Sequence, residues 1–237
     1  MDMNQSSLIP EKKSELTDRT VGRLVAYRRL LVRLLENNVS LVSSKAIGDL
    51  LGIKSSQVRK DLSYLGEFGK RGVGYNVSRL LNDLTGILAP FKPWQIGLIG
   101  MGRLGEALLG YSTLWGENYE IVCAFDVDEA KTGRTYFGKP CFHLRDFAQK
   151  AEEYGLGVVV IATPGNVAQK VTDQIVECGR IRGLLNFSAT SLAVPEEVEV
   201  SNVDISVELE KLLFRLKLHE QKKLLSLVTD MMANDLD

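Results

Sequence analysis

Residues 95–105 read Gln-Ile-Gly-Leu-Ile-Gly-Met-Gly-Arg-Leu-Gly, in which Gly100, Gly102 and Gly105 form a G-x-G-x-x-G pattern. A short apolar run precedes the three glycines and a helical pattern follows them. In a dinucleotide fold the first glycine permits a tight turn, the second lets a pyrophosphate approach, and the third packs helix against strand. The helix N-terminus adds backbone N–H groups. The pattern therefore predicts a cofactor site formed by Gly100, Met101, Gly102, Arg103, Leu104 and Gly105.

The next predicted strand, residues 120–126, supports this interpretation. It ends at Asp126, which lies 21 residues after Gly105. A carboxylate there accepts hydrogen bonds from the adenosine ribose hydroxyls and repels a 2′-phosphate. Asp126 therefore favours NAD over NADP.

Helical and strand patterns continue to alternate after Asp126. We expect helices over 144–153 and 166–177, and strands over 158–161 and 183–187. This order predicts an α/β fold with a doubly wound, Rossmann-like parallel sheet. Two strand ends then face the nucleotide crevice, although turn chemistry alone also explains Pro164. The expected ligands of the nicotinamide end are Thr163, Pro164, Asn186 and Phe187.

About ninety residues precede the glycine pattern, and their charge differs from that of the remainder. Residues 1–90 hold 14 Lys and Arg against 9 Asp and Glu, a balance of +5, and residues 91–237 hold 15 against 21, a balance of −6. A basic segment joined to an acidic one is typical of a nucleic-acid-binding module attached to another domain. The difference is weak evidence by itself, and its position along the chain strengthens it.

This basic segment has the pattern of a helix-turn-helix. Apolar residues recur at helical spacing over 20–36, and Ser43-Ser44 supplies hydroxyls to cap a second helix that Gly52 ends. Ser55-Ser56 is expected to cap a third helix over 57–65. Two short helices joined by a glycine-containing turn form the DNA-binding motif.

The third helix has one apolar face and one polar face. Val58, Leu62 and Leu65 project toward a core, whereas its polar residues cluster on the other side and Arg59 lies between the faces. Recognition helices contact base edges near their N-termini. Gln pairs with adenine, Lys or Arg pairs with guanine, and a flanking Arg also suits phosphate. The expected DNA contacts on this helix are Ser56, Gln57, Arg59, Lys60 and Ser63.

Residues 68–77 follow with three glycines around Lys70-Arg71. A tight, basic β-turn of this composition is typical of a wing that approaches a DNA backbone. A plain helical bundle with solvated charges explains each feature singly, but their order favours a winged helix. The expected wing contacts are Lys70, Arg71, Gly72 and Tyr75.

The bulk composition limits the other classes of function. The chain has 237 residues, 45% hydrophobic and 25% charged, which is typical of a globular protein. Its three cysteines form no C-x-x-C pair, which argues against a zinc site or a disulfide framework and favours the cytoplasm. The polar start suggests a loose arm without a signal core, and no apolar run approaches the length of a bilayer span. We expect no metal and no membrane contact.

Catalysis is not expected either. Dehydrogenases on this sheet usually add a domain with a general acid or base near the nicotinamide, and only about 50 residues follow Phe187. The two histidines, His143 and His219, have no partners at active-site spacing. They are interpreted as structural or solvated residues.

A long amphipathic helix is expected over 207–232, with a leucine-rich stripe. Such a stripe is buried either against the protein's own sheet or against a second protomer. In a two-fold dimer, two recognition helices match a palindromic operator.

Over roughly residues 16–215, the chain resembles the bacterial redox-sensing transcriptional repressor Rex family. The matching segments, in the family's order, are 55–64, 66–75, 100–105, Phe125-Asp126-Val127-Asp128, 185–187 and 202–204. The resemblance implies a homodimer of winged-helix heads on Rossmann domains, which binds operator DNA when NADH is scarce and leaves it when NADH rises. It also implies that NADH and NAD+ are sensed ligands, that Val127 lines their site, and that the terminal helix is swapped between protomers.

The same resemblance implies a switch. Arg28 matches a family position that reaches Asp204 of the dimer core, and Tyr111 is the competing partner. One carboxylate cannot satisfy both partners equally, so the hypothesis is that NADH moves Asp204 between them and rotates the heads. The alternatives are a solvated Arg28 and a packed Tyr111.

The sequence therefore predicts three parts: a winged-helix domain with an N-terminal arm over 1–90, a Rossmann domain over 91–205, and a dimerisation helix and tail over 206–237. Two rival functions remain open. One is a small NAD-dependent oxidoreductase whose basic front half serves dimerisation. The other is a DNA-binding protein whose Rossmann domain is only a dimerisation platform.

Overall fold

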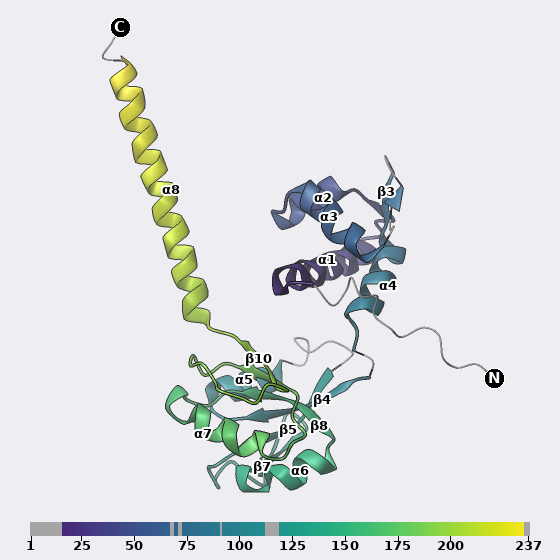
Figure 1. Cartoon of the computed structure of the whole chain (residues 1–237), viewed down its shortest axis with the longest axis vertical. Coiled ribbons are helices and arrows are strands. Elements are labelled where there is room, and N and C mark those ends of the chain that lie inside the picture. Colours follow the sequence, from purple (N-terminus) through teal and green to yellow (C-terminus); the bar gives the residue numbers. More distant parts are fainter. Residues whose placement is uncertain (1–15, 67–68, 71–72, 91, 112–118, 235–237) are drawn as a thin grey trace, which may run out of the picture. The chain divides into compact units, whose positions relative to one another are not determined.

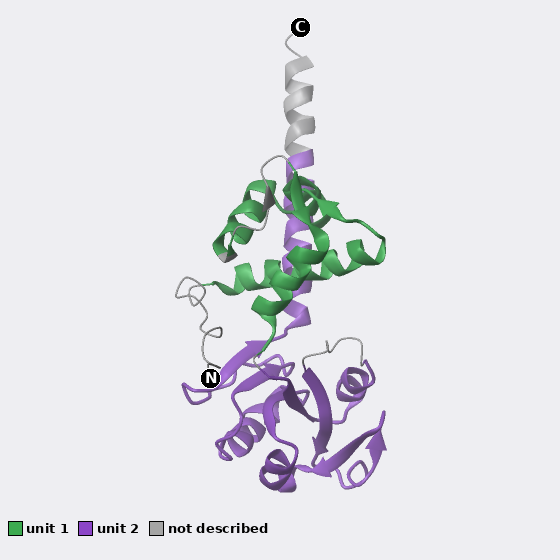
Figure 2. Cartoon of the chain, turned by 90° about the vertical axis from the view of Figure 1, so that its right-hand side faces the viewer, with its two compact units in different colours: residues 1–90 green, residues 91–237 purple. Residues whose placement is uncertain are grey.

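The structure is a computed structural model, and it describes residues 16–66, 69–70, 73–90, 92–111 and 119–234. Within helices and strands, the side chains at 65, 69, 70 and 224–234 fall outside this description. The chain divides into two compact units, residues 1–90 and residues 91–237 (Figure 2). Each unit has its own hydrophobic core, as a folding domain does.

The first unit is a winged helix. Its helices are α1 (Asp18–Glu36), α2 (Ser44–Leu51), α3 (Ser55–Leu65) and α4 (Val77–Leu88). The short strands β1 (Leu41–Val42), β2 (Gly69–Lys70) and β3 (Gly74–Asn76) form an antiparallel sheet in the order β1-β3-β2. The helix-turn-helix is α2–α3, and the wing is β2–β3. This confirms the predicted architecture.

The core of the first unit explains why these helices pack together. Leu24 and Leu31 on α1, Ile47 on α2 and Leu80 on α4 are fully or almost fully buried in one cluster. Ser43 caps α2 by accepting a hydrogen bond from the Ala46 N–H, as predicted. The cap predicted for α3 was wrong: Ser55 and Ser56 lie inside the helix, and the residue before it makes no side-chain cap bond. The patterns also did not single out α4.

The second unit is a parallel sheet with one antiparallel edge. Its strands are β4 (Trp94–Ile99), β5 (Tyr119–Asp126), β6 (Thr135–Tyr136), β7 (Lys139–His143), β8 (Leu156–Ile161), β9 (Gly183–Asn186) and β10 (Glu199–Asn202). Their order is β10-β9-β8-β4-β5-β7-β6, and only β6 runs antiparallel to its neighbour. The order reverses beside β4, as in doubly wound folds, so a crevice is expected there at the carboxyl ends of the strands. The predicted fold class is confirmed.

Helices cover both faces of this sheet (Figure 1). They are α5 (Arg103–Gly110), a 3₁₀ turn over Leu144–Asp146 that leads into α6 (Phe147–Glu153), and α7 (Gly165–Val176). Residues of α6 and α7 share one apolar cluster, and those of α5 belong to another. The prediction of a single helix over 144–153 was therefore wrong in its first turn. The patterns also missed the β6–β7 hairpin and β10.

The last helix, α8 (Ile205–Asn234), contains 30 residues and differs from the others. All of its described side chains, 205–223, are exposed, including Leu209, Leu212 and Phe214. The helix therefore does not bury its apolar residues on the sheet of its own unit.

Candidate functional site

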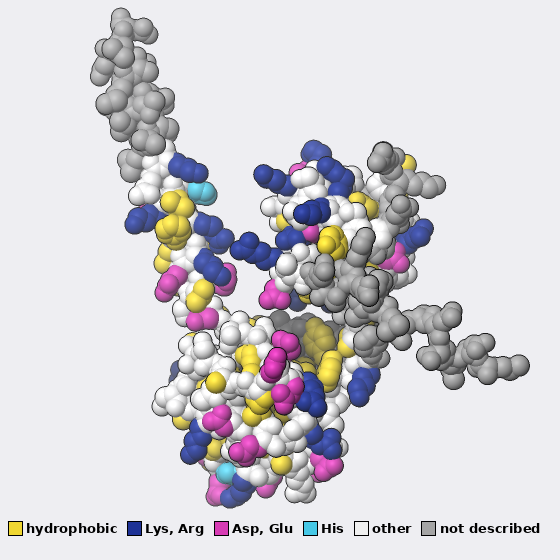
Figure 3. All heavy atoms as spheres, in the orientation of Figure 1, with side chains coloured by type: hydrophobic (Ala, Val, Ile, Leu, Met, Phe, Trp, Pro, Cys, Tyr) yellow, Lys and Arg dark blue, Asp and Glu magenta, His cyan; other side chains and the backbone are white. Residues whose placement is uncertain are grey.

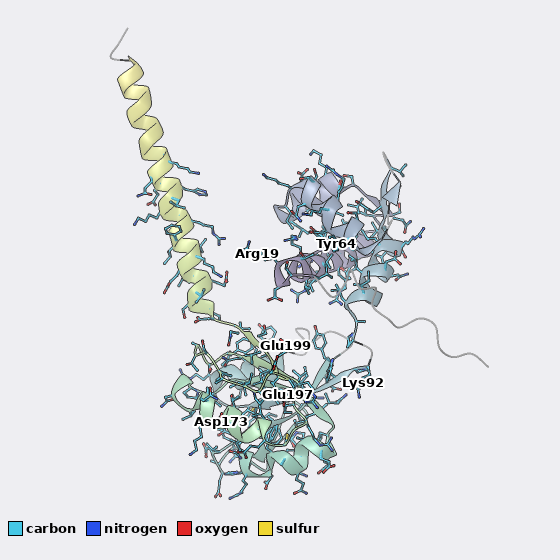
Figure 4. All side chains as sticks on the ribbon, in the orientation of Figure 1. Arg19, Tyr64, Lys92, Asp173, Glu197 and Glu199 are labelled. Atoms are coloured by element: carbon cyan, nitrogen blue, oxygen red, sulfur yellow. The ribbon has the colours of Figure 1, made fainter. Side chains whose placement is uncertain are left out.

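The polar face of α3 is open to solvent. Ser56, Arg59, Lys60, Ser63 and Tyr64 are all exposed, and Figure 4 labels Tyr64 on this helix. Lys and Arg side chains are numerous on the face of the first unit that Figure 3 presents. An exposed polar face with cations near the helix N-terminus has the chemistry needed to meet the edges and phosphates of duplex DNA.

Arg59 links the recognition helix to the rest of the motif. Its Nη1 donates to Ser44 Oγ at 3.1 Å, at the start of α2. Burial raises the pKa of the nearby half-buried Tyr75, and the positive charge of Arg59 partly opposes this rise. Arg59 therefore lies between α2 and the β3 strand of the wing. At the wing itself, Lys70 belongs to β2, whereas Arg71 and Gly72 lie outside the described residues.

Gln57 is placed differently from the other predicted DNA contacts. Its side chain is half-buried, and Nε2 donates to Asp61 Oδ1 at 2.8 Å, one turn along α3. The sequence grouped Gln57 with the outward polar residues of the helix, whereas the structure turns its amide toward Asp61. The reason is the carboxylate at i+4, which competes for its amide.

Asp61 is the centre of a buried network that sequence reasoning missed. Arg23 on α1 contacts it with Nε at 2.6 Å from Oδ2 and Nη2 at 2.8 Å from Oδ1, and Tyr27 donates its hydroxyl to Oδ2 at 2.8 Å. The carboxyl group is 3% exposed. Burial alone would raise the pKa of Asp61, but the hydrogen bonds from Arg23, Gln57 and Tyr27 lower it below its usual value. Burial and Asp61 together raise the pKa of Tyr27.

The three glycines of the fingerprint have three distinct environments. Gly100 has φ +97°, and a Cβ there would lie 2.8 Å from the carbonyl oxygen of Ala162. A Cβ on Gly105 would lie 1.9 Å from the carbonyl oxygen of Gly100, so helix α5 packs against the turn itself. A Cβ added to Gly102 would meet no other described part of the chain within 4 Å. The turn is therefore closed at its first and third glycines and open at the second, where a pyrophosphate approaches in this fold.

Asp126 stands at the carboxyl end of β5 beside this turn. Its Oδ2 accepts from the Met101 N–H at 2.8 Å, and its Oδ1 accepts from the Asp128 N–H at 2.9 Å. Lys131 Nζ lies 3.2 Å from Oδ2. Burial works to raise the pKa of Asp126, but these donors outweigh it and lower the pKa below its usual value. The group is thus an ionised acceptor at the position that faces an adenosine ribose in this fold.

The other fingerprint residues fall into two groups. Met101 is fully buried, whereas Arg103 and Leu104 are exposed at the start of α5. Val127 follows Asp126 and is 64% exposed, an unusual value for a valine after a buried strand. Arg103, Leu104 and Val127 are therefore exposed at the start of α5 and after β5.

Strand β8 brings a second polar group to the same edge of the sheet. The Ala162 N–H bonds to the Ile99 carbonyl at 2.8 Å, which places Thr163 and Pro164 next to the glycine turn. Thr163 Oγ1 is buried and has no hydrogen-bond partner in the described part of the chain. An orphaned hydroxyl at this edge fits a site that a polar ligand completes.

Asn186, at the end of β9, has hydrogen-bond partners within the protein for both ends of its side-chain amide. Its Nδ2 donates to the Thr190 carbonyl and to Asn202 Oδ1, both at 2.7 Å, and its Oδ1 accepts from the N–H and hydroxyl of Ser188. The side-chain amide is therefore occupied within the protein, and it shapes the loop that follows β9. The next residue, Phe187, packs partly buried against the cluster under α5.

The three predicted switch residues lie in separate elements. Arg28 is half-buried on α1, and Tyr111 follows α5 with 61% exposure. Asp204 precedes α8 and caps it, since its Oδ1 accepts from the N–H groups of Ser206 at 2.9 Å and Val207 at 3.3 Å. The side chain of Ser206, followed by the backbone N–H groups of Val207 and Ser206, lowers the pKa of Asp204 below its usual value against the opposing effect of burial. Asp204 thus already holds the first turn of α8.

Two negative findings apply to the described residues. No group of three or more His, Cys, Asp or Glu side chains among them is arranged to hold a metal ion. No helix in the same part of the chain is both long and apolar enough to cross a bilayer.

Comparison with known proteins finds matches in both units of the chain. Residues 91–190 match the family model of a CoA binding domain, and residues 15–63 match that of a putative DNA-binding protein N-terminus. The redox-sensing transcriptional repressor Rex of Desulforamulus reducens is 40% identical over 210 residues, which cover 89% of this chain and 100% of that protein. The chain belongs to the Rex family. The Rex repressor of Listeria welshimeri is 36% identical over 90% of this chain and 98% of its own length.

Solved structures of a Rex-family repressor, RSP, have the same fold. RSP in complex with β-NAD+ and operator DNA superposes with a TM-score of 0.80 at 30% identity, covering 89% of this chain and 97% of that one. RSP in complex with β-NADH superposes with a TM-score of 0.79 at 28% identity, covering 89% and 98%. Rex-family proteins are repressors and not enzymes, which agrees with the prediction from the sequence that the chain does not catalyse a reaction. The oxidoreductase alternative is thereby set aside.

Proposed function

We propose that this Rex-family chain is a homodimeric repressor that binds palindromic operator DNA in the cytoplasm and is released when NADH rises relative to NAD+. It would thereby control genes of NADH reoxidation, fermentation or respiration. The observation that carries the proposal is the presence of a winged helix and a fingerprint open at Gly102 in one chain. The RSP complexes with operator DNA and NAD+, and with NADH, support it.

DNA recognition is assigned to α3 and the wing. The exposed Lys60, at the base of the polar face, suits a guanine edge, and Arg59 suits a phosphate beside it. Gln57 acts from its half-buried position beside Asp61. The other proposed contacts are Ser56, Ser63, Lys70, Arg71, Gly72 and Tyr75.

Cofactor binding is assigned to the edge of the sheet around the glycine turn. The open face at Gly102 and the N-terminus of α5 receive the pyrophosphate, and Asp126 accepts from the ribose hydroxyls. Thr163 Oγ1 offers its unpaired hydroxyl, and Asn186 holds the loop that closes the nicotinamide end. The cofactor supplies a nicotinamide ring that is cationic when oxidised and neutral when reduced. The remaining proposed contacts are Gly100, Met101, Arg103, Leu104, Gly105, Val127, Pro164 and Phe187.

The dimer is assigned to α8, with residues 206–237 as dimerisation helix and tail. Its exposed apolar side chains include Leu209, Leu213 and Leu216, each about half exposed in the single chain. Exposed apolar stripes of this length mark protein–protein contacts. Exchange of α8 between two protomers buries them and pairs the two recognition helices for a two-fold operator.

The switch is assigned to Asp204, with Arg28 and Tyr111 as alternative partners. Because Asp204 Oδ1 already caps α8, a contact through the remaining oxygen leaves the cap intact. If Asp204→Ala changes neither the operator affinity nor its NADH response, this assignment fails. Arg29 follows Arg28 and is exposed, so Arg28→Ala and Arg29→Ala are compared directly. A loss of the response in Arg29→Ala alone would move the contact by one residue.

The deciding experiment titrates the purified full chain against a fluorescent palindromic duplex at fixed salt, with no cofactor, with NAD+ and with NADH. Tight binding that only NADH releases is the expected result. Binding that ignores both cofactors would leave the Rossmann domain as a dimerisation platform. Ionic strength is held constant because phosphate contacts make the affinity strongly salt-dependent.

A further inference from the structure

We propose that Asp61 is a positioning residue that orients the side-chain amide of Gln57, so that Gln57 favours a base with an exocyclic amino group, adenine or cytosine, over guanine. The inference rests on the proposed DNA-binding function and names a specificity element within it. Gln57 is the third residue of α3, in the first turn, from which recognition helices contact base edges.

The orientation of the amide follows from the chemistry of its partner. Gln57 and Asp61 Oδ1 approach to 2.8 Å, and an ionised carboxylate only accepts hydrogen bonds. The atom that faces Asp61 must therefore be the amide nitrogen Nε2, because a carbonyl oxygen there would meet another acceptor. Oxygen Oε1 is consequently left on the arm of the amide away from Asp61.

The carboxylate itself is held from several directions. Arg23 grips both oxygens, at 2.6 Å and 2.8 Å, and Tyr27 donates to Oδ2 at 2.8 Å. Asp61 is 3% exposed and Tyr27 is fully buried, so neither group exchanges its partners for water at low cost. The Asp61 carboxylate, to which the Gln57 amide bonds, is therefore held in one orientation by residues of α1.

A fixed amide has a different base preference from a free one. A free Gln either pairs with adenine N6 and N7 or turns its NH₂ toward an acceptor, and guanine presents two acceptors, N7 and O6, in the major groove. With Oε1 fixed outward, guanine O6 meets another acceptor, whereas adenine N6 and cytosine N4 supply the N–H that it needs. Asp61 thus converts an adaptable residue into one that rejects guanine.

The test measures base preference with a randomised half-site duplex library, selected by the full-length protein and sequenced. Gln57→Met removes the amide while keeping the length of the side chain. Asp61→Asn keeps the shape, but its own amide accepts either orientation of Gln57. The matched control is Asp49→Asn on α2, which loses an exposed carboxylate that pairs with Lys45 at 2.7 Å across the same i,i+4 spacing.

The wild-type chain is expected to favour adenine or cytosine over guanine by about tenfold at one position of each half-site. Gln57→Met should flatten the preference at that position alone. Asp61→Asn should admit guanine there, and Asp49→Asn should retain the wild-type profile. An Asp61→Asn profile identical to that of the wild type, or a Gln57→Met variant with every preference intact, would overturn the inference.

A second variant keeps Asp61 and its contacts with Arg23 and Tyr27 unchanged in sequence. Gln57→Glu presents acceptors only, so it should keep the rejection of guanine even though repulsion from Asp61 and phosphate weakens binding overall. A gain of guanine in Gln57→Glu would contradict the proposal. NADH binding by each variant, followed by nicotinamide fluorescence, reports that the second unit is folded. A wild-type chain that selects no duplex at all would instead refute the proposed function.

Discussion

Two buried aspartates, one in each unit, are held in opposite ways. Asp61 in the winged helix is 3% exposed and receives its hydrogen bonds from the side chains of Arg23, Tyr27 and Gln57. Asp126 in the Rossmann domain is 8% exposed and receives two of its three from backbone N–H groups, with Lys131 as the third donor. Both have lowered pKa values despite their burial. The first carboxylate joins helices, and the second joins a turn to a strand.

The difference matters for function. The side chains of Arg23 and Tyr27 tie the recognition helix to α1, which also carries Arg28, the proposed receiver of the redox signal. A carboxylate held by backbone amides is instead a preorganised acceptor whose position barely depends on neighbouring rotamers. Asp61 therefore fixes the recognition helix to α1, and Asp126 fixes an acceptor at the edge of the sheet.

The largest expected effect tests this contrast through stability. Asp61→Ala leaves the Arg23 charge and the buried Tyr27 hydroxyl without their acceptor, which should destabilise the first unit by about 3 kcal/mol. Unfolding is followed by far-ultraviolet circular dichroism for both units. Tryptophan fluorescence follows the second alone, since Trp94 and Trp115 both lie after residue 90. An equal loss of the free energy of unfolding measured by tryptophan fluorescence would contradict the separation of the two networks.

The next effect compares two glycines of the backbone-built site. Gly105→Ala should destabilise the second unit by about 2 kcal/mol, because its Cβ would lie 1.9 Å from the Gly100 carbonyl oxygen. Gly102→Ala has open space and should keep stability while weakening NADH binding at least tenfold. Thermal unfolding and NADH titration of both variants separate the two roles. A Gly102→Ala variant that binds NADH normally would place the pyrophosphate elsewhere.

Asp126→Asn should weaken NADH binding about tenfold, since the neutral amide offers one acceptor in place of two charged oxygens. It should also reduce the discrimination against NADPH, because the charge that repels a 2′-phosphate is gone. Asp128→Asn, which removes a neighbouring carboxylate with 48% exposure, is the control. Fluorescence titrations with NADH and NADPH give the affinity for NADH and its ratio to the affinity for NADPH. Equal changes in Asp126→Asn and Asp128→Asn would show that Asp126 does not bind the ribose.

The smallest expected effect is a dependence of stability on acid. A lowered folded pKa means that the unfolded chain binds more protons, so the contribution of each aspartate is full above its unfolded pKa, about 4, and is lost as pH falls through the folded value. Urea unfolding between pH 6 and pH 3 should therefore show falling stability in the wild type. The free energy of unfolding that circular dichroism gives for Asp61→Asn should fall less steeply with decreasing pH than that of the wild type. The free energy from tryptophan fluorescence should fall equally steeply in Asp61→Asn and in the wild type. Equal slopes in circular dichroism would contradict this.

Much of the second unit was predictable because its pattern is local. The glycines, the strand before them and Asp126 lie within about thirty residues, and each role follows from backbone geometry that the residue type requires. The capping serine of α2 was predictable for the same reason. The start of α3 was not, because the helix begins at Ser55 after Lys54, whose side chain makes no cap bond, and a serine pair in the sequence does not show whether it lies before or inside the first turn.

The sequence by itself therefore determined the winged helix, the parallel sheet, the fingerprint and the carboxylate at the end of β5, because these depend on residue spacing and backbone chemistry. Only the tertiary structure decided that Gln57 turns toward Asp61, that Arg23 and Tyr27 hold this carboxylate, and that Asn186 is occupied within its own loop. The first of these pairs lies within one helix, but the others join residues up to 38 positions apart. Competition for one acceptor depends on which donors folding brings to it, and spacing along the chain does not contain that information.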